Sequence, residues 1–431
     1  MASDNGDFRK TGIGTKLVHS GEIEDESFKA AVTPIYRATT YASDEELYSL
    51  IKRHGKTEDP HVEMTDEELK AFRYKIFYAR GANPNVVAVQ RKMPTLEGCD
   101  DAVAASSGMG AISSTLLSLI KGKKYIVSTP HVYGVTYSFI FNEMREMFGM
   151  KVIPTDVFLS KKWVNKADGQ EIAAIYIETL SNPFLVIPPL DEIMRVRDEL
   201  CPGTPIVVDN TFLTPVNFMP FTLLDPTRDL VLHSATKYLA GHSDVIGGIV
   251  CGPLGRINQV WEKMAAYGCC LDAETAYYLE RGLKTLHVRM ERHNQNMLEV
   301  YQYLVSVSEK FRLKIFHPLR GQYPIPDFAK SLVEQGKLGG MITFNIDGKD
   351  EEHGIQLMKV LHRTRVVKHA TSLGGVESLI SMPYNMSQPT WNQQEALGLK
   401  RFRCLLRLSI GIEDVKDIIG VLDQALSEIC K

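Results

Sequence analysis

The 431-residue sequence predicts an α/β fold, with a mostly parallel central sheet and a smaller α+β domain after it. From about residue 82, short apolar segments alternate with helical segments. The apolar segments lack the polar–apolar alternation of a sheet with one solvated face, so helices should cover both faces of this sheet. Near residue 270 the rhythm changes to a long helical stretch, which indicates the start of the second domain.

Residues 1–81 are predicted to form an N-terminal arm, because they are irregular and rich in charge. A charged insert at 42–75 lies within this arm. Its TDEEL segment predicts the start of a helix, since Thr65 and Glu68 have the spacing of a capping box. A solvated surface helix and an element that shapes a pocket mouth are both compatible with this insert.

Residues 82–270 are predicted to form the main domain. Its strand-like segments are 124–128, 151–154, 172–178, 205–209 and 229–234. Helical segments fall between several of them, at 110–121, 137–148 and 190–200. This order of strands and helices is typical of an open, mostly parallel sheet.

Residues 271–431 are predicted to form the C-terminal domain, which begins with one long connecting helix from DAETAYYLERGLKTL onward. Beyond that helix, the segments GMITFNID and LLRLSIG are strand-like and EHGIQLMKVLHRT is helical. A last helix is expected to end at Cys430. This mixture indicates a smaller α+β domain.

The composition excludes several classes of partner. A net charge of -3 gives no reason to expect nucleic acid or an anionic membrane surface. No apolar stretch approaches the ~20 residues that span a bilayer, and the start MASDNGDFRK lacks the apolar core of a signal peptide. The 7 cysteines are scattered without a C-x-x-C pair, which predicts neither a disulfide framework nor a zinc site. We therefore expect a cytoplasmic protein.

Functional residues are expected just after strands, because ligands of open α/β sheets bind at the carboxyl ends of the strands. The segment ASSGMGAISSTLLSLIKG opens an apolar helix, where the helix dipole and the backbone N–H groups of Gly108 and Met109 suit a phosphate. A plain serine helix cap is the alternative interpretation. Asp209 ends the PIVVD strand and needs a cationic partner, which is a pyridinium nitrogen, a nearby Arg or a helix N-terminus.

Lys237 lies between an apolar run and a Gly-rich turn, in DLVLHSATKYLAGHSDVIGG. Lysine usually keeps its ammonium in water at the surface. The exception is a lysine whose amine forms a Schiff base with a carbonyl group. Ser234 and Thr236 offer hydroxyls beside it, and Tyr133 is either a ring that stacks on a flat ligand or a buried structural residue. An anion cup, a carboxylate, an amine and an aromatic face together describe a site for a phosphorylated pyridine aldehyde.

The chain resembles a known family, the pyridoxal-phosphate enzymes of cysteine and methionine metabolism, which includes cystathionine and methionine γ-lyases and the γ-synthases. The resemblance runs from TKLVHSG to LRLSIGIED and follows the motifs YARGANPN, SSGMGAI, ETLSNP, VDNTF, SATKY, GHSDVIGG, RGLKTLHVRM and SLGGVESLI. It implies fold type I of these enzymes, the aspartate aminotransferase-like fold, and pyridoxal 5'-phosphate as the cofactor.

The resemblance also implies a role for each site residue. Lys237 forms the Schiff base with the cofactor, Asp209 pairs with its pyridine nitrogen, and Tyr133 stacks on its ring and assists proton transfers. Asn182 lies near the ring hydroxyl, and Arg407 binds the carboxylate of the amino acid substrate together with Ser372. The phosphate is held by Gly108, Met109, Ser234 and Thr236, with Tyr78 and Arg80 from a neighbouring subunit. Active sites are therefore shared within dimers, which in this family usually pair into a homotetramer.

Four positions in the wall of the site constrain the substrate. Relatives that take cystathionine tend to carry an acidic residue before the YAR motif, an Arg five positions after the stacking Tyr and a Glu before SLGG. This chain has Phe77, Ser138 and Thr371 there, so no partner for a second amino acid head group is evident. These residues resemble methionine γ-lyases, although those enzymes usually have a Cys where this chain has Val135.

We therefore expect a carbon–sulfur lyase of sulfur amino acid metabolism. It would carry out γ-elimination on a methionine-like amino acid, or less readily on cystathionine, giving an α-keto acid, ammonia and a thiol. The alternative is γ-replacement, as in O-acetylhomoserine sulfhydrylase or cystathionine γ-synthase. A nucleotide-binding oxidoreductase is disfavoured, since GIGTK at 12–16 is neither a G-x-G-x-x-G nor a P-loop. An inactive homologue is disfavoured because Lys237, Asp209 and Arg407 are all present.

Overall fold

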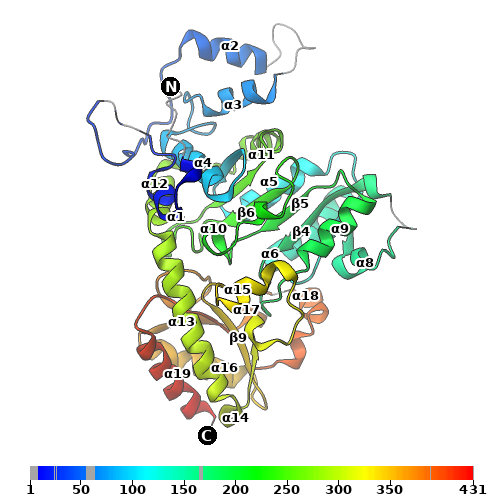
Figure 1. Cartoon of the computed structure of the whole chain (residues 1–431), viewed down its shortest axis with the longest axis vertical. Coiled ribbons are helices and arrows are strands. Elements are labelled where there is room, and N and C mark those ends of the chain that lie inside the picture. The colour runs from blue at the N-terminus through cyan, green and yellow to red at the C-terminus, as the bar shows by residue number, and fades with distance from the viewer. Residues whose placement is uncertain are drawn as a thin grey trace. The chain divides into compact units, whose positions relative to one another are not determined.

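The computed structural model (Figure 1) describes residues 8–430 apart from 24, 26, 55–63, 165–167 and 389. The chain forms two compact units. Unit 1 comprises Met1–Lys121, Met219–Ala240 and Asp244–Thr285, and unit 2 comprises Gly122–Phe218, Gly241–Ser243 and Leu286–Lys431. Residues 55–63 of the charged insert lie outside the described part of the chain. The three-part division at residues 81 and 270 stays a prediction.

The larger sheet has seven strands in the order β1-β7-β6-β5-β4-β2-β3. Along β5, β4, β2 and β3 every neighbouring pair is parallel, whereas β7 is antiparallel to both β1 and β6. The predicted α/β class is therefore confirmed, with a mixed sheet. The bounds are β1 Asp101–Ala105, β2 Tyr125–Ser128, β3 Lys151–Pro154, β4 Ile172–Glu178, β5 Ile206–Asp209, β6 Leu230–Ser234 and β7 Gly248–Gly252.

Strands β1 and β7 were missed by the sequence prediction because their side chains are small. β1 reads DAVAA, and β7 reads GIVCG just after a Gly-rich turn. Gly248 is needed where β7 begins, since a β carbon there would lie 2.2 Å from the carbonyl oxygen of Ser107. This close approach holds the chain that leads into helix α5 (Gly108–Leu119) against the first residue of β7.

The helices of unit 1 pack around β1, β6 and β7. Helix α5 contacts β6, β7 and α11, and α4 contacts β1 and α12. Their bounds are α1 Ile13–His19, α2 Glu45–His54, α3 Asp66–Tyr74, α4 Pro84–Glu97, α5 Gly108–Leu119, α11 Leu254–Tyr267 and α12 Ala273–Lys284. The predicted helix at 110–121 is α5, which begins two residues earlier because Ser107 caps it: the Ser107 hydroxyl accepts a hydrogen bond from the N–H of Gly110.

The charged insert is anchored by its second helix, α3. The predicted capping box of Thr65 and Glu68 is confirmed. Arg73, near the end of α3, is buried, donates to Asn258 Oδ1 at 2.8 Å and forms an ion pair with Asp101. Since Asp101 begins β1 and Asn258 lies in α11, these bonds tie the insert to the sheet and to a helix that covers it. Helix α3 is therefore packed on unit 1 rather than solvated on all sides.

Unit 2 contains the smaller sheet, which has five strands in the order β10-β11-β12-β9-β8. The predicted strands in GMITFNID and LLRLSIG are confirmed as β9 and β12. Helices α13 (Leu286–Ser306) and α16 (Glu351–Arg363) both contact the last helix, α19 (Val415–Ile429), as Figure 1 shows. The strands are β8 Leu313–Phe316, β9 Met341–Ile346, β10 Val367–His369, β11 Ser378–Ser381 and β12 Leu405–Ser409.

The helices of unit 2 include several of a single turn. Between the predicted ends 137 and 148, a π-helical turn at Phe139–Glu143 connects α6 to α7. In the part of the chain that the structure describes, no helix has the length and apolarity of a membrane span. The bounds are α6 Gly134–Ser138, α7 Met144–Phe148, α8 Thr155–Leu159, α9 Leu190–Leu200, α10 Thr214–Asn217, α13 Leu286–Ser306, α14 Ser308–Phe311, α15 Lys330–Glu334, α16 Glu351–Arg363, α17 Pro383–Met386, α18 Trp391–Ala396 and α19 Val415–Ile429.

The prediction of one long connecting helix after residue 270 is wrong, because the helix breaks at Thr285. Both the backbone N–H and the hydroxyl of Thr285 donate to the carbonyl of Gly282, each at a distance of 3.3 Å. A threonine hydroxyl that donates to a backbone carbonyl three residues earlier competes with the helical hydrogen bonds. The stretch is therefore divided between α12 in unit 1 and α13 in unit 2.

The Arg73–Asp101 pair should contribute strongly to stability. Substitution Arg73→Ala leaves the buried Asp101 carboxylate without its cation, which should lower the free energy of unfolding by about 3–5 kcal/mol. Arg53→Ala is the matched control, since its ion pair with Glu68 is partly exposed and should be worth less than about 1 kcal/mol. Urea denaturation followed by circular dichroism measures both. Equal effects of the two substitutions would contradict this role of Arg73.

Candidate active site

The predicted phosphate cup lies in unit 1, at the start of α5. Gly108 and Met109 are the first residues of this helix, where backbone N–H groups point out of the helix and its dipole favours an anion. A β carbon on Gly108 would lie 2.8 Å from both Cβ and Oγ of Ser234. The structure thus brings Ser234, the last residue of β6, against the first turn of α5, as a cup for a phosphate requires.

The turn after β6 holds Thr236 and Lys237. The Thr236 hydroxyl accepts a hydrogen bond from the N–H of Gly247 at 3.0 Å, which fixes it between this turn and the residue just before β7. The N–H of Lys237 donates to the carbonyl of Ser234 at 3.1 Å. Lys237 itself is half-buried. The lysine is therefore three residues from the cup, on backbone fixed by hydrogen bonds.

Tyr78 and Arg80 lie in another part of unit 1, on an exposed stretch after α3. Tyr78 is 41% exposed and forms an isolated β-bridge with Thr40. The Arg80 guanidinium lies 5.7 Å from the centre of the Tyr78 ring and donates to the carbonyl of Ala265 at 2.9 Å. Their exposed side chains fit the implied role in the site of a neighbouring subunit.

In unit 2, Asp209 is the last residue of β5 and is only 8% exposed. Its carboxylate accepts hydrogen bonds from the Tyr176 hydroxyl at 3.2 Å, from the N–H of Thr211 at 3.0 Å and from the Thr211 hydroxyl. These donors compensate a negative charge for its loss of water. A carboxylate so placed suits a cationic partner such as a protonated pyridine nitrogen.

Glu178 is a residue that the sequence analysis missed. It ends β4, is 7% exposed, and stands opposite Asp209 in the parallel pairing of β4 with β5. Burial, and then the charge of Asp209, raise the pKa of Glu178 well above its ordinary value of 4.5. The available sequence signal was its position: Glu178 ends a buried strand within ETLSNP, just as Asp209 ends PIVVD.

Tyr133 is the N-cap residue that precedes α6, and Glu178 contacts it directly. The backbone N–H of Tyr133 donates to Glu178 Oε1 at 2.6 Å, and the next N–H, of Gly134, donates to the carbonyl of Ser387 at 3.0 Å. The residue is 42% exposed, which argues against a buried structural tyrosine. Its main chain is thus fixed while its ring stays accessible for stacking.

The structure brings Asn182, Ser372 and Arg407 together in unit 2. Arg407 lies in the middle of β12 and is 4% exposed. Its guanidinium donates to Asn182 Oδ1 and to the Ser372 carbonyl, each at a distance of 3.2 Å. Ser372 has a φ of 80°, which is unfavourable for a serine and is typical of ligand-binding segments. A planar guanidinium can bind both oxygens of a carboxylate at once, so Arg407 suits an anionic ligand of that kind.

The four wall positions are all uncharged. Phe77 packs on Phe72, with ring centres 5.6 Å apart. Val135 is 43% exposed and lies two residues after Tyr133, Ser138 ends α6, and Thr371 is exposed just before Ser372.

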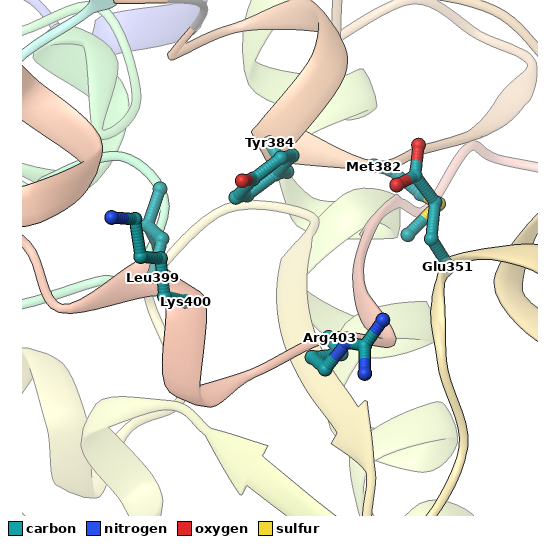
Figure 2. Close-up of a pocket in the computed structure, with 6 residues that line it drawn as sticks. All are labelled: Glu351, Met382, Tyr384, Leu399, Lys400 and Arg403. Atoms are coloured by element: carbon teal, nitrogen blue, oxygen red, sulfur yellow. The ribbon is translucent and has the colours of Figure 1, made fainter. Parts of the chain in front are cut away.

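A separate pocket of about 250 Å³ lies in unit 2, lined by Glu351, Met382, Tyr384, Leu399, Lys400 and Arg403 (Figure 2). None of the predicted site residues lines it. The Lys400 ammonium lies 3.3 Å from the centre of the Trp391 ring and, in Figure 2, on the opposite side of the pocket from Arg403 and Glu351. Its mixed charges select no particular ligand.

Residues 14–427 match the model of one family, described as Cys/Met metabolism PLP-dependent enzyme. The chain belongs to this family. It is therefore an enzyme that uses pyridoxal phosphate, and its fold is that of fold type I, as predicted. Within unit 1, the cup at Gly108 and Ser234 fits a phosphate group, and within unit 2 the buried carboxylate of Asp209 fits a protonated ring nitrogen. The GIGTK segment lies at the start of α1, which removes the nucleotide-binding alternative together with this assignment.

Similar proteins include both lyases and synthases. An L-methionine gamma-lyase of Treponema denticola is 32% identical over 430 residues, which cover 99% of each chain. A cystathionine gamma-lyase of Bacillus subtilis is 32% identical over 96% of this chain and 99% of that protein. The crystal structure of cystathionine gamma synthase from Xanthomonas oryzae pv. oryzae, in complex with cystathionine, has a TM-score of 0.78 and 27% identity, and it covers 97% of this chain and 98% of that one.

The cup should tolerate no side chain on its first residue. Gly108→Ala places a β carbon 2.8 Å from Ser234 and should weaken binding of pyridoxal phosphate about tenfold or more, since overpacking typically costs 1–3 kcal/mol. Gly420→Ala in α19 is the matched control, because an added β carbon would meet nothing within 4 Å apart from its own chain neighbours and helix backbone, and it should leave binding unchanged. Fluorescence titration of the apoprotein measures both affinities. Unaltered affinity in Gly108→Ala would contradict this placement of the phosphate.

Proposed function

We propose that this enzyme catalyses γ-elimination on methionine or a similar amino acid with an uncharged γ-thioether, and releases an α-keto acid, ammonia and a thiol. The observation that carries this proposal is the absence of charge at Phe77, Ser138 and Thr371. A cystathionine substrate ends in a second amino acid head group, which these side chains do not pair. The similarity to the L-methionine gamma-lyase of Treponema denticola supports the same reading.

The catalytic roles follow from the chemistry of each side chain. Pyridoxal phosphate supplies, when bound, an electron sink that stabilises negative charge at the substrate's Cα. Lys237 would hold the cofactor through its amine, and the same amine, when free, would accept the Cα proton as general base. Asp209 balances the charge of a protonated ring nitrogen. Tyr133 stacks on the ring and assists the later proton transfers at the leaving group.

One set of residues would bind the substrate's α-carboxylate, and another would bind the cofactor's phosphate. Arg407 binds the substrate's α-carboxylate with both arms of its guanidinium, which Asn182 and Ser372 orient. Asn182 also lies near the ring hydroxyl in this assignment. The phosphate is held by Gly108, Met109, Ser234 and Thr236, with Tyr78 and Arg80 of a neighbouring copy. The working enzyme would then be a cytoplasmic homotetramer, built as a dimer of dimers with shared sites.

A second candidate function is γ-replacement. The similarity to a solved cystathionine gamma synthase favours it. Both reactions remove a group from Cγ, and they differ in whether a nucleophile then adds there. The side chains that hold and move the proton at Cα are the same for both.

The function is tested by a panel of substrates. We expect methionine to give keto acid and thiol at rates well above those for cystathionine, and Lys237→Ala to abolish turnover, because no other amine is assigned to the Cα proton. Keto acid release, measured with purified protein plus pyridoxal phosphate, follows both. A weak signal with methionine, together with homocysteine formation from O-acetylhomoserine and sulfide, would replace elimination by γ-replacement as the function.

Arg407 should matter for substrate affinity more than for cofactor binding. Arg407→Lys keeps the charge but loses the bidentate geometry, so KM for methionine should rise about 10- to 100-fold while the cofactor still binds. Arg403→Lys, four residues earlier and exposed, is the matched control and should leave KM unchanged. Initial rates over a range of methionine concentrations measure both variants. An unchanged KM in Arg407→Lys would remove Arg407 from the carboxylate site.

A further inference from the structure

We propose that Glu178 is a positioning residue of this site, which in its neutral acid form fixes the main chain of Tyr133. This inference rests on the proposed function, because it assumes that Tyr133 stacks on the cofactor ring. Glu178 acts through Tyr133 and Asp209 and is not assigned any contact with the substrate.

The geometry of Glu178 makes it a link between two strand ends and a helix start. It ends β4 beside Asp209 of β5, and its Oε1 accepts the N–H of Tyr133 at 2.6 Å. Tyr133 is the N-cap residue of α6, but its own side chain makes no capping hydrogen bond there. The bond from Glu178 therefore fixes the point where the chain enters α6, and with it the position from which the Tyr133 ring projects.

The two neighbouring carboxyl groups have unequal surroundings. Asp209 accepts from Tyr176 and twice from Thr211, whereas the described hydrogen bond to Glu178 comes from one backbone N–H. Two buried carboxylates this close do not both ionise readily, so the proton stays on the group with fewer donors. The hydrogen-bonding geometry thus favours an ionised Asp209 and a neutral Glu178.

The surroundings of Glu178 also favour its neutral, protonated form. Burial and the charge of Asp209 both raise the pKa of Glu178. Tyr176, on the same strand, also has a raised pKa because of burial and then Asp209, so it remains a hydroxyl donor. Strand β2, on the other side of β4, presents the neutral Ser128, whose hydroxyl donates to the Tyr176 carbonyl. A neutral Glu178 leaves Asp209 as the single negative charge among these groups.

Substitutions of Glu178 by glutamine and by alanine test whether its role is that of a neutral acid or of an ionised carboxylate. Glu178→Gln keeps an oxygen that accepts the Tyr133 N–H but carries no charge, so kcat/KM for methionine should stay within about threefold of the wild type. Glu178→Ala removes the acceptor and should lower kcat/KM about 100-fold, as misplacement of a positioned group can. Visible circular dichroism of the bound cofactor should change in Glu178→Ala and not in Glu178→Gln, which reports the ring's surroundings rather than overall stability.

The apoprotein provides a second readout. A raised pKa means that folded Glu178 keeps a proton that the unfolded chain loses above about pH 4.5, so ionisation of the unfolded state lowers stability as pH rises through this window. Glutamine does not titrate. The Tm of Glu178→Gln relative to the wild type should therefore increase between about pH 5 and pH 8.

The outcomes distinguish this inference from the proposed function. If Glu178→Gln loses as much kcat/KM as Glu178→Ala, or if its Tm relative to the wild type stays flat with pH, the neutral-acid role is overturned. If the wild type binds the cofactor but does not catalyse γ-elimination of methionine, the proposed function is wrong. The pH dependence of Tm in Glu178→Gln and the wild type would still show whether Glu178 is protonated. If Glu178→Ala does not fold, kcat/KM and the pH dependence of Tm are compared between Glu178→Gln and the wild type alone. A large loss of kcat/KM in Glu178→Gln, or a flat difference in Tm, would then overturn the neutral-acid role.

Discussion

The negative charge of Asp209 is the constraint on which the rest of the site depends. A carboxylate that is 8% exposed at the end of a buried strand is stable only if donors and a cation replace its water. Tyr176 and Thr211 supply donors, and in the function we propose a protonated pyridine ring would supply the cation. That ring must keep its proton to withdraw electrons from the substrate. The charge of Asp209 therefore connects the fold to the chemistry.

Each of the two units fixes its candidate site residues in a different way. In unit 1, close contacts leave no room for a side chain at two glycines: a β carbon on Gly108 would meet the Ser234 side chain, and one on Gly248 would meet the Ser107 carbonyl. In unit 2, hydrogen bonds to the main chain orient functional groups, as Glu178 does for Tyr133 and Arg407 does with Ser372. The close contacts at glycines and the hydrogen bonds that involve the main chain thus both fix the positions of candidate site residues.

The sequence predicted the strands with long apolar side chains. Lys237, Asp209 and Arg407 were singled out because each is an unusual residue type in its motif, and their roles stay predictions. It missed β1 and β7, whose small side chains give little hydrophobic pattern. It missed the break at Thr285, where the threonine hydroxyl donates to the backbone carbonyl of Gly282. Glu178 was missed for a different reason: its importance comes from pairing with Asp209 across two strands, and register is a tertiary property that a single motif does not encode.

The most direct test of the central claim is the protonation state of the cofactor's ring nitrogen. The wild-type enzyme and Asp209→Asn would be loaded with pyridoxal phosphate carrying ¹⁵N in the ring, and the nitrogen chemical shift would be recorded at neutral pH. The account predicts a protonated ring nitrogen in the wild type and loss of that proton in Asp209→Asn, with turnover lost in parallel. An unprotonated nitrogen in the active wild type would contradict it.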